Sequence, residues 1–293
     1  MVRFYILSIL LGLTGVASAQ AGGGLQQVQD FGPNSSGARM FVYKPNNLPE
    51  KPAIVVGIHY CSGTAQKYYN GSPYKGLADQ KRFIVIYPES PYSGGCWDVS
   101  SKATLTRDGG ANSNSIANMV KYTIKEFKAD PSKVFVVGES SGGMMTNVLA
   151  STYPDLFAAA IVYSGVPAGC FFTNTVNGWN NSCSSGQVHA TPERWAQWVF
   201  DAYPGYHGSR PRMQIYHGSA DTTLASPNYM ETIKQWSGVF GYDSSKPESQ
   251  KANTPQSGYT TSTYGDHLIG VYAQNVGHGV PVHGVEDVKF FGL

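Results

Sequence analysis

The chain has 293 residues, of which 41% are hydrophobic, enough for a sizeable core in one or two domains. Only 14% of the residues are charged and the net charge at pH 7 is +2, which argues against nucleic acid or an anionic membrane surface as a partner. The 19 tyrosines and 34 glycines indicate a loop-rich surface with aromatic contact area.

The first residues have the composition of a secretory signal peptide. Arg3 supplies a positive charge, residues 6–16 form an apolar stretch, and residues 17–19 are the small residues of a cleavage site. The apolar stretch is well short of the ~20 residues that a transmembrane helix needs. We therefore predict a signal peptide over residues 1–19, secretion to the extracellular space, and a mature chain that begins near Gln20.

Strand and helix patterns alternate along the rest of the chain. Short apolar or β-branched runs that fit buried strands lie at residues 39–43, 53–58, 83–87 (ended by Pro88), 134–137, 157–163, 213–216 and 269–273. Helical patterns lie at residues 114–127, 144–150, 192–200 (with Thr191 as N-cap) and 228–240, and residues 285–291 form a terminal helix or turn. This alternation predicts a mainly parallel central sheet with helices on both faces.

The domain organisation is predicted to be simple. Residues 169–190 are irregular, but the chain has no internal repeat, low-complexity linker or Ser/Thr/Pro-rich stretch. We expect one domain over residues 20–293 and no appended binding module.

Four cysteines are present, at positions 61, 96, 170 and 183. In a secreted chain an even number favours disulfides, and three pairings are possible. We favour Cys61–Cys96, which would tie two loops that each follow a predicted strand, and Cys170–Cys183, which would close a short loop. The absence of a C-x-x-C pattern gives no indication of a metal site.

Three sequons, at Asn34, Asn70 and Asn180, lie in turn-like polar contexts. Each is a candidate N-glycosylation site.

The most informative motif is Gly138-Glu-Ser-Ser-Gly142, which follows an apolar strand and precedes a helical segment. A G-x-S-x-G sequence in this context is typical of a nucleophile elbow. Ser140 is then expected on a sharp, strained turn, and the two glycines leave room for the strand and the helix to approach closely. The motif predicts a nucleophilic serine, followed along the chain by an acid and then a histidine.

Asp221 and His278 are the candidates for those two roles. Asp221 lies in the loop after the strand at residues 213–216, although an aspartate there can also serve as a turn residue or N-cap. Of the seven histidines, only His278 and His283 follow the last predicted strand, and His278 lies in a glycine-flanked loop. We predict His278 as the base, while His59 is expected to support its loop and His217 to pack under the acid.

The oxyanion hole needs two backbone donors. One is predicted to be the amide of Ser141, after the nucleophile, and the other the amide of Cys61, in the loop after an early strand. Such preorganised donors supply roughly 3–4 kcal/mol each.

Two tryptophans are candidates for substrate contact. Trp97 and Trp179 lie in glycine-rich loops, where an indole face would suit a sugar ring, although burial in the core is the commoner fate. Trp195, Trp198 and Trp236 have helical spacing and are expected in the core.

Several motifs together resemble a known family. They stand in the order His59–Ala65, Ser90–Asp98, Asn112–Val120, Gly138–Met145, His217–Asp221 and Gly277–Pro281. In these motifs the chain resembles the fungal acetylxylan esterases of carbohydrate esterase family 1, which are related to type B feruloyl esterases and to extracellular polyhydroxybutyrate depolymerases.

This resemblance implies an α/β-hydrolase fold and deacetylation of xylose units in acetylated xylan or xylo-oligosaccharides, without metal or cofactor. It also implies Ser140 as nucleophile, Asp221 as acid and His278 as base, with Cys61 and Ser141 as oxyanion donors. We expect a monomer. Three positions depart from the family pattern: Glu139 replaces a small or hydroxyl residue, Gly143 an alanine and Pro167 a small residue.

Because of these departures, feruloyl esterase and polyhydroxybutyrate depolymerase activity on the same triad remain alternatives. A more distant alternative is a non-catalytic carbohydrate-binding or adhesion protein on a hydrolase scaffold.

Overall fold

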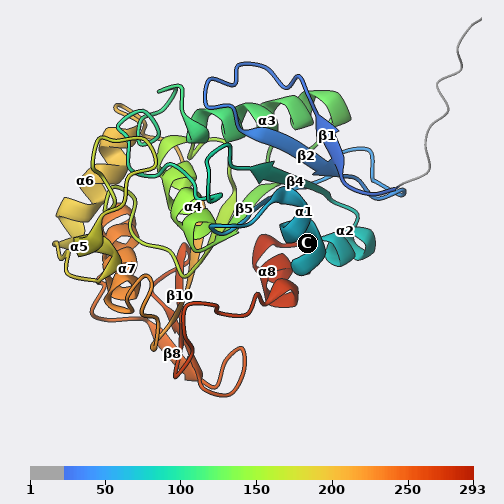
Figure 1. The fold of residues 1–293 in the computed structure, drawn as a ribbon. Coiled ribbons are helices and arrows are strands. Elements are labelled where there is room, and N and C mark those ends of the chain that lie inside the picture. The colour runs from blue at the N-terminus through green and yellow to red at the C-terminus, as the bar shows by residue number, and fades with distance from the viewer. Residues whose placement is uncertain (1–22) are drawn as a thin grey trace, which may run out of the picture.

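The computed structural model describes residues 23–293, so the predicted signal peptide lies outside the described residues. These residues form one sheet of ten strands in the order β1-β2-β4-β3-β5-β6-β7-β10-β9-β8 (Figure 1). The six strands from β4 to β10 in this order run parallel, and antiparallel strands are added at both edges. The predicted mainly parallel sheet is therefore confirmed.

The strands are β1 (Gln26–Val28), β2 (Arg39–Tyr43), β3 (Ile54–Ile58), β4 (Ile84–Glu89), β5 (Val134–Glu139), β6 (Ala159–Tyr163), β7 (Arg212–Gly218), β8 (Ser249–Ala252), β9 (Tyr259–Thr263) and β10 (Leu268–Ala273). In the central strands successive side chains enter two different cores. Val134 and Val136 of β5 pack into one core, and Phe135 and Val137 pack into the other. A strand that is buried on both faces needs a continuous apolar sequence, which is what β3 to β6 have.

Helices cover both faces of the sheet (Figure 1). The core on one face receives side chains from α3 (Asn112–Phe127), α4 (Ser141–Thr152), α6 (Pro192–Ala202) and α7 (Pro227–Phe240). The core on the other face receives side chains from α1 (Ala65–Gly71), α2 (Tyr74–Lys81) and α8 (Gly284–Phe291). The short α5 (Asn181–Ser184) lies within the segment that was predicted to be irregular.

Strand β4 is longer than predicted. The sequence pattern ends it before Pro88, but the strand continues to Glu89. Pairing between β3 and β4 stops at Ile86, whereas Pro88 pairs only with Met40 of β2. A proline is tolerated there because that part of the strand has a neighbour on one side only.

Both favoured disulfides, Cys61–Cys96 and Cys170–Cys183, are present. The sequons differ in accessibility. Asn70 is exposed, and it lies in the last turn of α1 rather than in a loop. The amide nitrogens of the half-buried Asn34 and Asn180 donate to the carbonyls of Ala38 and Cys170.

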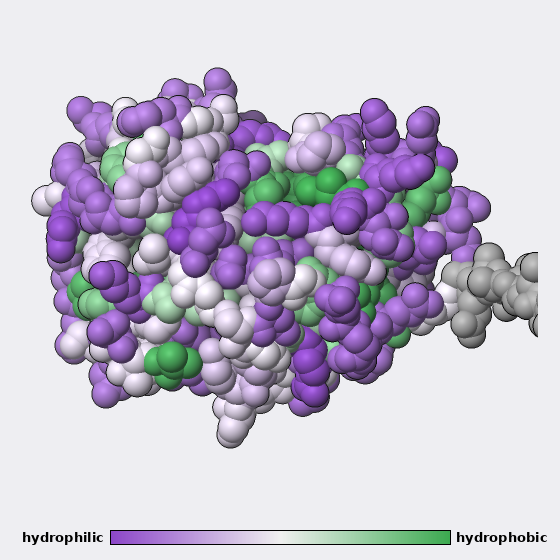
Figure 2. Space-filling model, turned by 90° about the horizontal axis from the view of Figure 1, so that it is seen from above, coloured by the Kyte–Doolittle hydropathy of each residue, from purple (hydrophilic) through white to green (hydrophobic). Residues whose placement is uncertain are grey.

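None of the helices in residues 23–293 is both long enough and apolar enough to cross a membrane. The face of the molecule seen in Figure 2 is mostly hydrophilic, with small, separate hydrophobic patches. Scattered patches of this kind are normal on a water-exposed surface.

Candidate active site

Ser140 lies on a strained turn between β5 and α4, with φ 55° and ψ −119°. This backbone conformation is unfavourable for a residue with a side chain. A Cβ at Gly138 would collide with the backbone of Gly142, and one at Gly142 would collide with the Ile58 carbonyl at the end of β3. The two glycines are therefore required because three backbone segments meet around Ser140.

A glycine at position 143 is also required by a close backbone approach. A Cβ on this residue would lie 2.6 Å from the Tyr163 carbonyl oxygen of β6. That is closer than real Cβ atoms approach, so the neighbouring strand leaves no room for the alanine that is common in the family pattern.

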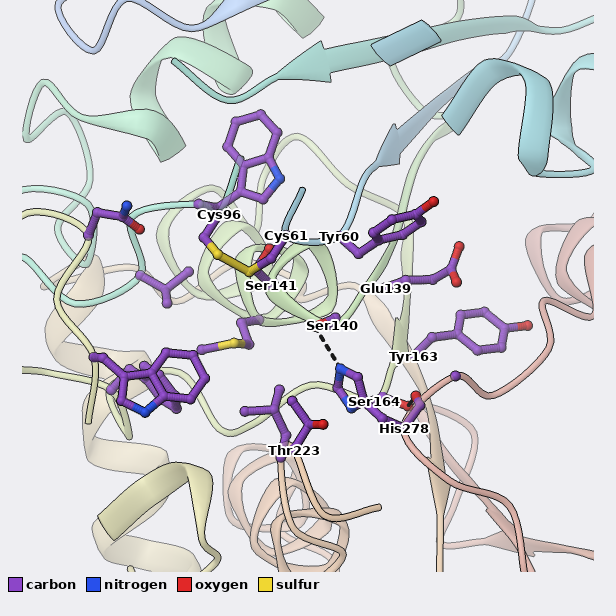
Figure 3. Close-up of a pocket in the computed structure, with 18 of the residues that line it drawn as sticks. Tyr60, Cys61, Cys96, Glu139, Ser140, Ser141, Tyr163, Ser164, Thr223 and His278 are labelled. Carbon is purple, nitrogen blue, oxygen red and sulfur yellow. Dashed lines mark hydrogen bonds between the residues drawn. A yellow bond between two sulfur atoms is a disulfide. The ribbon is translucent and has the colours of Figure 1, made fainter. Parts of the chain in front are cut away.

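Three predicted side chains meet at this turn. The Ser140 hydroxyl lies 2.8 Å from Nε2 of His278, a hydrogen bond drawn in Figure 3. Nδ1 of the same imidazole lies 2.8 Å from Oδ2 of Asp221. These residues come from loops after β5, β7 and β10, which are parallel and end at one edge of the sheet. The arrangement can transfer the serine proton to an imidazole that is held in one tautomer by a carboxylate.

Asp221 is buried and surrounded by donors. The backbone amides of Thr223 and Leu224 donate to its Oδ1, at 2.9 and 3.0 Å, so Asp221 also has the turn role that was its alternative. Nε2 of His217 lies 3.2 Å from its Oδ2, consistent with the predicted supporting position of His217. Burial acts to raise the pKa of Asp221, but the hydrogen bonds from His217 and His278 outweigh it and hold the pKa well below its usual range.

The loop of His278 is held by a residue that the sequence analysis missed. The Ser164 hydroxyl donates to the His278 carbonyl at 2.7 Å, and Ser164 has a positive φ of 48°. The available signal was its position directly after β6, at the sheet edge where Ser140 lies. The other candidate base, His283, lies at the start of α8, with its ring stacked on Tyr216.

Comparison with known proteins agrees with this geometry. A model of the esterase PHB depolymerase family matches residues 39–248. The chain belongs to this esterase family. Acetylxylan esterase A of Aspergillus ficuum is 62% identical over 277 residues, which cover 94% of this chain and 91% of that protein.

Solved structures give the same result. An acetyl xylan esterase from Aspergillus awamori has a TM-score of 0.91 and 63% identity, covering 92% of this esterase and 99% of that chain. An S-formylglutathione hydrolase from Staphylococcus aureus has a TM-score of 0.53 at 15% identity, covering 92% and 97%, and supports the fold alone. The α/β-hydrolase fold is thereby confirmed, and the protein is a carboxylic ester hydrolase.

The predicted oxyanion loop of the esterase is firmly held. Nδ1 of His59 lies 2.7 Å from the Tyr60 carbonyl, and Nε2 of the same ring accepts from the Ser90 amide. The disulfide from Cys61 to Cys96 ties the loop to the segment after β4 (Figure 3). Cys61 and Ser141 line one cavity with Ser140, and no protein hydrogen bond from either amide is found within residues 23–293.

Trp97 differs from its predicted role. Its indole is only 1% exposed, and its Nε1–H donates to the His59 carbonyl at 2.9 Å. A buried, hydrogen-bonded ring offers little face to a sugar, so Trp97 supports the oxyanion loop. Trp195 and Trp236 are buried as expected, and Trp198 packs partly buried against the same core.

A cavity of about 630 Å³ opens beside Ser140. Its wall is mainly apolar and includes Met144, Phe171, Leu224 and Trp179. Trp179 is 54% exposed, and its ring meets that of Phe171 edge-on, with the centroids 5.0 Å apart. Among the residues described, no three His, Cys, Asp or Glu side chains are grouped so that they could hold a metal ion.

Glu139 has an unusual position for a carboxyl group, directly before the nucleophile and half-buried. Burial raises its pKa to about 7, although the nearby Tyr68 hydroxyl and His278 lower it in part. This departure from the family pattern therefore places a carboxyl group with a raised pKa directly beside the nucleophile.

Proposed function

We propose that this esterase removes acetyl groups from xylose residues of acetylated xylan, through a Ser-His-Asp acyl-enzyme mechanism. The observation that carries the proposal is the hydrogen-bonded series from Ser140 through His278 to Asp221. The acetyl substrate is inferred from the relatives, named acetylxylan esterases, that are about 62% identical over most of the chain. The same triad argues against a protein that only binds carbohydrate.

In the first step, Nε2 of His278 takes the Ser140 proton as the hydroxyl oxygen attacks the acetyl carbonyl carbon. Asp221 stabilises the imidazolium, and the Cys61 and Ser141 amides donate to the developing oxyanion. The carbon–oxygen bond to the sugar then breaks, and the sugar oxygen takes the proton from His278. The products are a free xylose hydroxyl and an acetyl-Ser140 ester.

In the second step, water attacks the acetyl-enzyme. His278 takes a proton from the water and returns it to the Ser140 oxygen when the ester bond breaks. Acetate leaves, and the enzyme regains its starting state.

One observation favours keeping a bulkier acyl group as a second candidate. The apolar cavity beside Ser140 is much larger than an acetyl group requires, and it contains the aromatic rings of Phe171 and Trp179. A feruloyl group would find both volume and aromatic contacts there, and a hydroxybutyrate polymer would find volume.

Rates on acetylated xylan, methyl ferulate and polyhydroxybutyrate, measured side by side, test the choice. We expect the wild type to release acetate fastest, and Ser140→Ala to release none above background. Acetate release retained by Ser140→Ala would show that Ser140 is not the nucleophile. A wild type inactive on all three substrates would favour the carbohydrate-binding alternative.

We also propose that the enzyme is secreted and acts as a monomer. The two disulfides support an oxidising compartment, where such bonds persist. Acetylated xylan is a polymer outside the cell, so a secreted enzyme would meet it directly.

A further inference from the structure

A second cavity, of about 390 Å³, lies next to the apolar one. The two cavities share Tyr60 and Glu139, so they meet beside the nucleophile. The second cavity is also lined by Lys67, Tyr68, Gly71 and Ser72, and its wall is more polar than that of the first. Neither the triad nor the predicted oxyanion donors use it.

Glu139 presents an unused acceptor to this second cavity. Figure 3 shows its carboxyl group pointing away from the Ser140–His278 pair, on the side of Tyr60. Within residues 23–293, the Tyr68 hydroxyl is the one side-chain donor near the Glu139 carboxyl group. A carboxylate has about four acceptor positions, so the others remain for hydroxyl groups of a ligand.

Two hydroxyl groups lie buried behind this wall. The Tyr68 hydroxyl lies near Glu139, and the Ser72 hydroxyl lies near that of Tyr87. Both hydroxyl oxygens have almost no accessible surface, so the Glu139 carboxyl group is the acceptor that a ligand in the cavity could reach. Lys67, in contrast, donates to the Ser62 carbonyl at 3.0 Å and is already engaged.

Tyr60 lies where the two cavities meet. Its ring is 39% exposed and lies edge-on to the ring of Tyr68, with the centroids 6.5 Å apart. The next residue is Cys61, the predicted oxyanion donor, so Tyr60 would lie close to a bound ester group. An exposed phenol ring offers an apolar face and a polar tip, which is the pattern of a sugar ring with its hydroxyls.

The two cavities differ in the chemistry that they can accept. The apolar one suits the acyl part of an ester, and the polar one suits its alcohol part. We propose that the second cavity binds a sugar unit on the alcohol side of the ester, a neutral polyol, and that Glu139 accepts hydrogen bonds from its hydroxyl groups. This assignment rests on the proposed function, because it presupposes a carbohydrate ester at Ser140.

Gly71 allows the cavity to be filled without touching the triad. It lies in the last turn of α1, and a Cβ there would meet no atom within 4 Å. Gly71→Leu also keeps the Asn70-x-Ser72 sequon. Gly76 of α2 is the matched control, since it is exposed, has equally open space around its Cα and does not line the cavity.

The test compares kcat/KM on an acetylated xylo-oligosaccharide with kcat/KM on 4-nitrophenyl acetate, whose alcohol part is not a sugar. We expect Gly71→Leu and Glu139→Met, which removes the acceptor oxygens at similar length, each to lower the ratio of the two values about tenfold, mainly through KM for the oligosaccharide, as for a lost pocket contact. Gly76→Leu should keep the wild-type ratio.

An unchanged ratio in both variants, with an active wild type, would overturn the assignment of the cavity and leave the proposed function intact. A wild type that hydrolyses 4-nitrophenyl acetate but not the oligosaccharide would instead overturn the proposed function.

Discussion

Two aspartates of this esterase, Asp221 and Asp287, are both buried and hydrogen-bonded but differ in charge behaviour. Asp221 accepts from two backbone amides and lies beside two imidazoles, and its pKa is held well below the usual range. Asp287 accepts from the hydroxyls of Tyr74 and Tyr163, at 2.6 and 2.7 Å.

Burial raises the pKa of Asp287 to about 7. The two phenol donors lower it only in part, and the negative charges of Glu139 and Glu286 raise it further. Burial alone therefore does not decide whether an aspartate is charged; the donors and the neighbouring charges do. Asp221 can stay ionised opposite a catalytic imidazolium, whereas Asp287 links α8 to α2 and β6.

The sharpest test of this difference is activity. We expect Asp221→Asn to lower kcat by about 10³–10⁴-fold, because an amide does not hold the imidazole in the required tautomer. Asp287→Asn should retain most of the activity in its folded fraction. Steady-state acetate release measures both, and equal losses in the two variants would contradict the assignment of roles.

Substitution of Asp287 should reduce stability more than substitution of Asp221, the reverse of the order expected for activity. In Asp287→Ala the hydroxyls of Tyr74 and Tyr163 lose their acceptor while still buried, so we expect the free energy of unfolding to fall by about 2–5 kcal/mol. Urea unfolding followed by tryptophan fluorescence measures the change. If Asp287→Ala loses less unfolding free energy than Asp221→Asn, Asp287 is not a structural link.

The pH dependence of stability follows from the raised pKa. Folded Asp287 keeps its proton up to about pH 7, whereas the unfolded chain loses it near the ordinary value of 3.8. The folded state binds more protons in this window, so this group's contribution to stability falls as the pH rises, by at most about 1.4 kcal/mol per pH unit. Unfolding free energies at several pH values should show a smaller slope in Asp287→Asn than in the wild type; an identical slope would exclude this titration.

The smallest expected effect concerns His217, whose Nε2 lies 2.8 Å from the Leu224 carbonyl and 3.2 Å from Oδ2 of Asp221. His217→Leu removes this polar contact beside the carboxylate, so we expect kcat to fall about 2–10-fold, with KM little changed. His217→Gln, whose amide can still donate, should recover part of the loss. If the glutamine variant is as slow as the leucine variant, shape rather than donation explains the role of His217.

Much of the fold could be predicted from the sequence because the central strands are buried on both faces. Strands β3 and β5 are continuous apolar runs, and the predicted segments begin within one residue of the observed starts. In contrast, β8 has the sequence Ser-Gln-Lys-Ala and is exposed throughout, so no apolar alternation marks it. Helices α1 and α2 were missed because they are short and separated only by Ser72 and Pro73.

The candidate site was predictable where chain order and backbone geometry determine it. The motif of the strained turn identifies Ser140, and the order of the strands identifies Asp221 and His278. Contacts such as that of Ser164 with the His278 carbonyl depend on how two loops meet in space, and no local pattern marks them. The buried state of Trp97 likewise depends on a carbonyl 38 residues away.

The conformation of Ser140 has a consequence for how this enzyme could change under selection. A residue with a side chain is held there at a cost of about 1–3 kcal/mol, which glycine would largely avoid. Ser140→Gly should thus melt at a higher temperature than its parent while being unable to form an acyl-enzyme. Directed evolution that selects for thermal stability alone, without an assay of activity, would therefore favour loss of the Ser140 hydroxyl.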